Sequence, residues 1–145
     1  MRGLVHGAWM GWGALIIFMG AIAGCASTPN RGSQPVASEA CGVEIQSLRV
    51  TAAGGFLDLR FRVLEPEKAA TFLDPSVPAS LLHEPTGRLL SVASSKIGKL
   101  RQHTSSPERG REYFMLFRNS AGMVAPGDRV ILMAGPCRIE GLEVQ

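Results

Sequence analysis

Strict alternation of apolar and polar side chains over residues 57–63, within a predicted strand at 56–64, is the feature that most limits how this chain can fold. Large apolar residues occupy every second position and charged residues lie between them: Leu57, Leu59, Phe61 and Val63 against Asp58, Arg60 and Arg62. Side chains of a strand point alternately to its two faces, so this segment must bury one face and expose the other. One solvated face is typical of antiparallel sheets.

Other segments carry shorter apolar patterns and are separated by turn residues: 42–51, 77–84, 88–94, 111–118, 129–134 and 137–144. About seven strands within about 100 residues predict an all-β fold, an immunoglobulin-like β-sandwich. The alternative is a small, open β-barrel.

Several residues predict local irregularities. The phase of the apolar positions changes near Gln46 and Ser47, which predicts a β-bulge there, and Gly141 predicts a second bulge. Residues 65–73 predict a short helix because Pro66 suits a first helical position. Pro78 predicts that the strand following it lies at a sheet edge.

The first 24 residues differ in composition from the rest of the chain. Arg2 is the single charged side chain, and an apolar run extends from Ala8 to Gly24. A positive start, an apolar middle and a small-residue end are typical of a secretory signal peptide. The run is short for a transmembrane helix, which usually needs about 20 apolar residues. An uncleaved N-terminal anchor is the alternative.

Ile22-Ala23-Gly24-Cys25 closes the apolar run and resembles the lipobox of bacterial prolipoproteins. The resemblance implies that the Cys25 thiol receives a diacylglyceryl group, that a peptidase cuts between Gly24 and Cys25, and that the freed amine is acylated. More than one acyl chain gives a stable membrane anchor. Because Ala26 follows Cys25, the resemblance also implies sorting to the outer membrane of the cell envelope, facing the periplasm.

Composition divides the remainder into a tether and one domain. Residues 25–40 are mostly small and polar and predict a lipidated, flexible tether. Residues 41–145 make 105 residues, enough for one domain with its own core. The segments LDLRFRVLEPEKA and YFMLFRNSAGMVAPGD also resemble an uncharacterised family of secreted bacterial β-sandwich proteins. That resemblance spans most of residues 42–145 and implies no activity.

Two cysteines remain once Cys25 is assigned to the lipid. An even pair in an oxidising compartment predicts a disulfide between Cys41 and Cys137, and two unpaired buried thiols are the alternative. Each cysteine lies at the start of a predicted strand. A bridge therefore requires both starts at one end of the domain, with the two strands parallel or facing each other across the sheets.

Charge is modest overall and concentrated in one place. Residues 25–145 hold 14 basic and 12 acidic residues, so 14 − 12 = +2, which is too small a charge to favour nucleic acid. The predicted polar loop 95–110 and its margin hold the densest basic group: Lys96, Lys99, Arg101, Arg109 and Arg111. This group predicts a contact with an anionic surface, such as lipid headgroups or an acidic partner, and a solvated loop is the alternative.

Signs of other chemistry are weak. The sequence has no HExxH, nucleophile-elbow or P-loop motif, so we expect no enzyme, no catalytic residue and no cofactor. Soft metal donors are present but not closely spaced: His83, His103, Met115, Met123 and Met133. The leading hypothesis is a non-enzymatic, lipid-anchored envelope protein that binds another envelope component. The alternatives are a periplasmic copper carrier and an unrecognised hydrolase.

Overall fold

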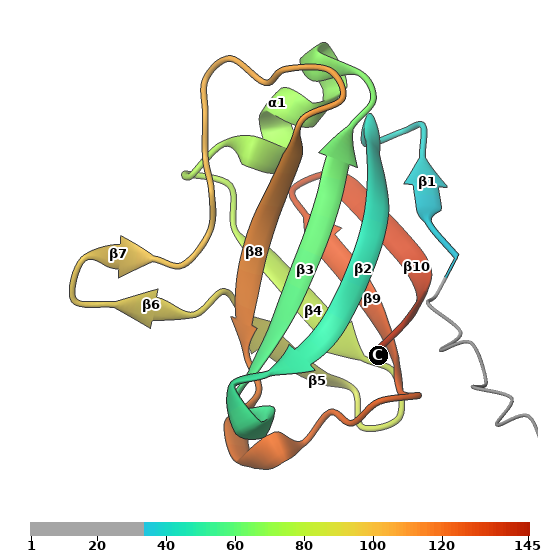
Figure 1. Cartoon of the computed structure of the whole chain (residues 1–145), viewed down its shortest axis with the longest axis vertical. Coiled ribbons are helices and arrows are strands. Elements are labelled where there is room, and N and C mark those ends of the chain that lie inside the picture. The colour runs from blue at the N-terminus through green and yellow to red at the C-terminus, as the bar shows by residue number, and fades with distance from the viewer. Residues whose placement is uncertain (1–33) are drawn as a thin grey trace, which may run out of the picture. The chain divides into compact units, whose positions relative to one another are not determined.

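Two four-stranded antiparallel sheets pack together in the computed structural model, which describes residues 34–145 (Figure 1). The predicted all-β sandwich is therefore confirmed, and its immunoglobulin-like character stays a prediction. The signal peptide and the lipidation site at Cys25 lie outside the described residues.

The first sheet has the strand order β1-β2-β3-β8. Its strands are β1 (Val36–Ser38), β2 (Val43–Thr51), β3 (Phe56–Val63) and β8 (Glu112–Arg118). The short 3-10 turn η1 (Ala52–Gly54) connects β2 to β3. The β2–β3 register shifts between Ile45 and Ser47, which confirms the bulge predicted from the change of apolar phase.

The second sheet has the order β10-β9-β4-β5. Its strands are β4 (Ala79–His83), β5 (Arg88–Ser91), β9 (Arg129–Ala134) and β10 (Cys137–Glu143), and the 3-10 turn η2 (Ser120–Gly122) lies between β8 and β9. The β9–β10 register shifts between Ile139 and Leu142, so the bulge predicted at Gly141 is confirmed.

The edge position predicted from Pro78 is wrong, because β4 lies between β9 and β5. Pro78 precedes Ala79, the first paired residue of β4. Its missing N–H therefore removes no hydrogen bond from the ladder, which is how a proline is tolerated before a central strand.

The domain also begins earlier than predicted. Residues 36–38, assigned from composition to the tether, form β1 and pair with β2 from Val43 to Ile45. Val36 is partly buried against the core. One apolar side chain and the backbone bonds to β2 are enough to order this segment, although its neighbours are small and polar.

The core is built on the alternating apolar side chains of β3. Leu57, Leu59, Phe61 and Val63 of β3 are all fully buried. Helix α1 (Pro66–Leu73) starts at Pro66 as predicted and packs its Phe72 edge-on against Phe61, with ring centroids 4.8 Å apart. Burying one such phenyl ring stabilises the fold by about 1.5–3 kcal/mol.

The seam between β2 and β10 is fastened at both ends. Cys41, just before β2, forms a disulfide with Cys137 at the start of β10, and their Cα atoms lie 5.5 Å apart. At the other end, the backbone N–H of Gln145 donates to Leu48 O (2.8 Å), and Val50 N–H donates to Gln145 O (2.9 Å). The two strands therefore start at the same end and run parallel, one in each sheet, which is one of the two arrangements that the predicted bridge allowed.

We expect the bridge to contribute strongly to stability, because it closes a loop with a sequence separation of 96. The chain-entropy account predicts that closing a loop of about 100 residues adds roughly 4 to 5 kcal/mol to the free energy of unfolding, and measured contributions of disulfides are typically about 2 to 4 kcal/mol. Reductant should lower the melting temperature of the wild type by several degrees. The Cys41→Ala/Cys137→Ala variant should have a lower melting temperature than the oxidised wild type, and reductant should not change it.

Mass spectrometry of protein purified from an oxidising compartment and alkylated without reduction should find Cys41 and Cys137 unmodified and linked. Alkylation of both thiols in the native protein would contradict the bridge.

Candidate functional site

A short arm projects from the side of the sandwich next to β8 (Figure 1). Its strands β6 (Ser94–Ser95) and β7 (Gly98–Lys99) pair antiparallel and leave Lys96 and Ile97 at the tip. Ser95 Oγ accepts from Ile97 N–H and donates to Gly98 O, at 3.3 Å each. The Ile97 side chain is 96% exposed. The arm thus presents a large apolar group to water on a hydrogen-bonded turn.

The root of the arm is held by one residue of β8. Ala93 N–H donates to Leu116 O (2.7 Å), Leu116 N–H donates to Leu100 O (2.9 Å), and Leu100 N–H donates to Ala93 O (2.7 Å). Both legs of the arm therefore bind the backbone of Leu116. The chain on either side adds isolated bridges, Val92 to Phe117 and Arg101 to Met115. These contacts also cover the free edge of β8.

Arg101 ties the same root to helix α1. Its Nη1 donates to Val77 O at 2.9 Å, and its Nη2 donates to Phe72 O at 2.8 Å and to Asp74 O at 3.1 Å. The carbonyls at a helix C-terminus lack intrahelical donors, and a positive charge there also favours the helix dipole. Arg101 thus satisfies the carbonyls at and just beyond the end of α1 while fixing the chain that leaves the arm.

Burial has an electrostatic consequence for Arg101, which is only 5% exposed. Loss of water lowers the pKa of its guanidinium, and the nearby Asp74 carboxylate partly opposes that shift. The pKa of Asp74 is itself lowered, first by hydrogen bonds from the Ser76 hydroxyl and backbone N–H and to a smaller extent by Arg101. The pair keeps opposite charges beside the end of the helix.

The five basic residues predicted to meet an anionic surface therefore lie in three places. Lys96 and Lys99 are exposed on the arm, and Lys99 Nζ makes one long contact of 3.4 Å with Pro75 O. Arg109 and Arg111 are exposed in the turn before β8. The prediction is wrong for Arg101, because its guanidinium is buried and bonded to three carbonyls.

Arg109 and Arg111 do not extend the basic tip of the arm. Five residue steps along the chain separate Arg111 from Leu116, and a strand rises about 3.3 Å per residue, so roughly 16 Å lies between them. Arg111 also forms an ion pair with Glu108 at 2.8 Å and lies over the Tyr113 ring. Lys96 and Lys99 form no ion pair with any residue of 34–145, so they are the better candidates for an anionic contact.

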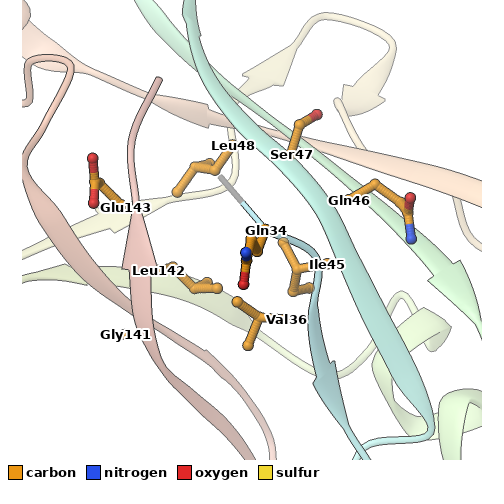
Figure 2. A pocket seen from close by; sticks show the side chains of 9 residues that line it. All are labelled: Gln34, Val36, Ile45, Gln46, Ser47, Leu48, Gly141, Leu142 and Glu143. Atoms are coloured by element: carbon orange, nitrogen blue, oxygen red, sulfur yellow. The ribbon is translucent and has the colours of Figure 1, made fainter. Parts of the chain in front are cut away.

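A groove of about 240 Å³ lies along the β2–β10 seam between its two fastened ends (Figure 2). Its walls include the bulged residues of both strands and residues of the β1 segment: Gln34, Val36, Ile45, Gln46, Ser47, Leu48, Gly141, Leu142 and Glu143. Ligand pockets usually enclose about 300–1,000 Å³. This groove is small, and we assign it to the local separation of two bulged strands.

His83 links two loops at the end of the second sheet. Its Nδ1 lies 2.8 Å from Thr86 Oγ1 and its Nε2 lies 3.2 Å from Asp128 Oδ2. Asp128 also accepts a hydrogen bond from Ala125 N–H. This bond is the main reason that the pKa of the Asp128 carboxyl is lowered, and His83 makes a smaller contribution. His83 is 3% exposed. Both ring nitrogens are engaged within the fold, so neither is free to bind a copper ion.

The other predicted metal donors lie on different elements: Met115 on β8, Met123 after η2, Met133 on β9 and His103 after the arm. Met115 is buried in the core, Met123 packs partly buried against it, and His103 is exposed in the loop after the arm. Within residues 34–145, no group of three or more His, Cys, Asp or Glu side chains is placed to hold a metal ion. The same residues also contain no helix long and apolar enough to cross a membrane.

Sequence reasoning missed two features of this site. Ile97 stood in a stretch predicted to be a polar loop, and a single apolar residue there carries no periodic signal. Leu116 acts through its backbone, which the side-chain pattern does not reveal. The available signal was the Ser-Lys-Ile-Gly run from Ser95 to Gly98, whose glycine adopts a φ of 125° and whose serine favours a turn.

Comparisons with known proteins do not identify the chain. No protein-family model matches it, and searches of curated proteins and of solved structures found no similar protein. The predicted relation to a family of secreted β-sandwich proteins therefore stays a prediction.

We expect Arg101→Met to destabilise the domain by about 2 to 3 kcal/mol, because it leaves the carbonyls of Phe72, Asp74 and Val77 without their charged donors. Arg101→Lys should be intermediate, since one ammonium cannot reproduce the planar fork. Arg109→Met is the matched control and should change stability by less than about 0.5 kcal/mol. Urea unfolding measures all three variants, and equal stability of the Arg101→Met and Arg109→Met proteins would contradict the assigned role.

Proposed function

We propose that this chain is an exported, lipid-anchored protein of the bacterial cell envelope, acylated at Cys25 after cleavage behind Gly24. The support is the lipobox-like end of the leader together with the Cys41–Cys137 disulfide, since stable disulfides form mainly in exported proteins. Ala26 favours the outer membrane, with the domain facing the periplasm.

We further propose that the sandwich is a non-enzymatic module that binds another component of the envelope. The observation that carries this proposal is the arm, which exposes Ile97 and two lysines on a hydrogen-bonded turn. A single exposed apolar side chain is common on protein surfaces, so the proposal rests on its combination with two lysines on a projecting turn. Arg101 and His83 are buried, and their side chains make their hydrogen bonds within the fold.

Cys25→Ser tests the anchor. The wild-type chain should incorporate labelled fatty acid and migrate as the processed form, whereas Cys25→Ser should remain an unlabelled precursor because it lacks the thiol that accepts the lipid. Cys41→Ala/Cys137→Ala is the control, since it removes two other cysteines and should still be labelled. Equal labelling of the wild type and Cys25→Ser would contradict the proposed lipidation.

A further inference from the structure

We propose that the envelope component met by the arm is the membrane surface itself: Ile97 enters the interfacial layer of an anionic bilayer while Lys96 and Lys99 pair with headgroup phosphates. The inference rests on the proposed anchor for its nearness to a membrane, and on the chemistry of the arm for the contact.

The charge of the arm matches an anionic surface. No acidic residue occurs between Glu84 and Glu108, whereas four basic residues do: Arg88, Lys96, Lys99 and Arg101. Lys96 lies beside Ile97 at the tip and Lys99 follows on β7, so an approaching phosphate meets no carboxylate of the arm. Each basic residue held near an anionic membrane raises binding about fivefold at moderate salt.

The shape of the tip favours a bilayer over a folded partner. Stable protein interfaces bury about 800 Å² on each partner, with several clustered anchors. Here the exposed apolar group is a single side chain on a protruding turn (Figure 1). A bilayer interface rearranges around one inserted side chain, and the lysine stems lie along the apolar layer while their ammonium groups stay in water.

The matched comparison within the fold is Leu89, the other large hydrophobic residue that is strongly exposed among residues 34–145, at 63%. Leu89 lies on β5, at the edge of the second sheet, rather than on a projecting turn. It therefore has similar apolar character and is also exposed, but it lacks the geometry that a membrane contact needs.

The reach of the tether is sufficient. Nine residue steps separate Cys25 from Gln34, which is about 30 Å when fully extended. From β1 to β8, the first sheet has three strand spacings, or about 14 Å, and the arm adds roughly 10 Å. The sum is shorter than the tether, so the anchor and the tip can occupy one bilayer although β1 and the arm lie on opposite sides of the first sheet.

The test uses the full, lipidated chain in vesicles of neutral or anionic lipid. Ile97→Cys carries a polarity-sensitive fluorophore, since Cys25 is acylated and Cys41 and Cys137 are bridged, and Leu89→Cys with the same label is the control. On anionic vesicles the label at 97 should shift to the blue and be quenched by lipids brominated in their acyl chains. The label at 89 should stay in water.

Lys96→Gln/Lys99→Gln, made in the Ile97→Cys background, should lower the ratio of inserted to free arm by roughly 20-fold, and high salt should act in the same direction. Arg109→Gln in that background should have little effect. A label at 97 that stays in water on anchored protein, or that inserts no more than the label at 89, would overturn the inference. Shielding of the label only after a purified envelope protein is added would also overturn it, in favour of a protein partner.

The experiment also distinguishes a missing lipid anchor from a missing membrane contact of the arm. If the chain takes up no fatty acid, the lipid-anchor proposal fails, and the same labels are then read in the Cys25→Ser background, where the introduced cysteine is again the site that takes the fluorophore, on protein added to vesicles from solution. Insertion of the label at 97 would still support the arm as a membrane contact, and its absence would reject it.

Discussion

The covalent link between Cys41 and Cys137 is the constraint on which the rest of the structure depends. A sandwich of two sheets has two open sides, and here the side between β2 and β10 is closed by the disulfide at one end and by Gln145 at the other. Because β1 and then Cys41 follow the predicted tether, a pull from the proposed membrane anchor would reach β1 first and the disulfide next. The disulfide transfers that load to the second sheet.

The opposite side is closed by polar rather than covalent contacts. The backbone of Leu116 binds both legs of the arm, and Arg101 spans from the arm to the end of α1. A buried cation is costly unless its donors are matched; three carbonyls near the end of a helix accept from Nη1 and Nη2 of Arg101, whereas its buried Nε has no partner among the described residues. The arm is therefore ordered before it meets any partner, which lowers the entropy that binding must remove.

Much of this fold was predictable because the preferences that determine it act between residues close together in the sequence. The alternation around Phe61, the phase change at Gln46 and the suitability of Pro66 for a helix start each act within a few residues, and the structure confirms them. The role of Arg101 was not predictable, because its burial depends on carbonyls 24 to 29 residues away. Likewise, β1 is ordered by pairing with β2, which the composition around Val36 does not show. The lipobox stays a prediction, since Cys25 lies outside the described residues.

The central claim is that the closed sandwich displays one ordered arm toward an anionic membrane. Hydrogen–deuterium exchange of the lipidated chain, compared on anionic and neutral vesicles, tests it most directly because every backbone amide is read at once. The account predicts slower exchange on anionic vesicles for residues 94–99 and unchanged exchange along β5 and in the turn holding Arg109. Unchanged exchange in residues 94–99, with slowing on another face of the sandwich, would contradict it.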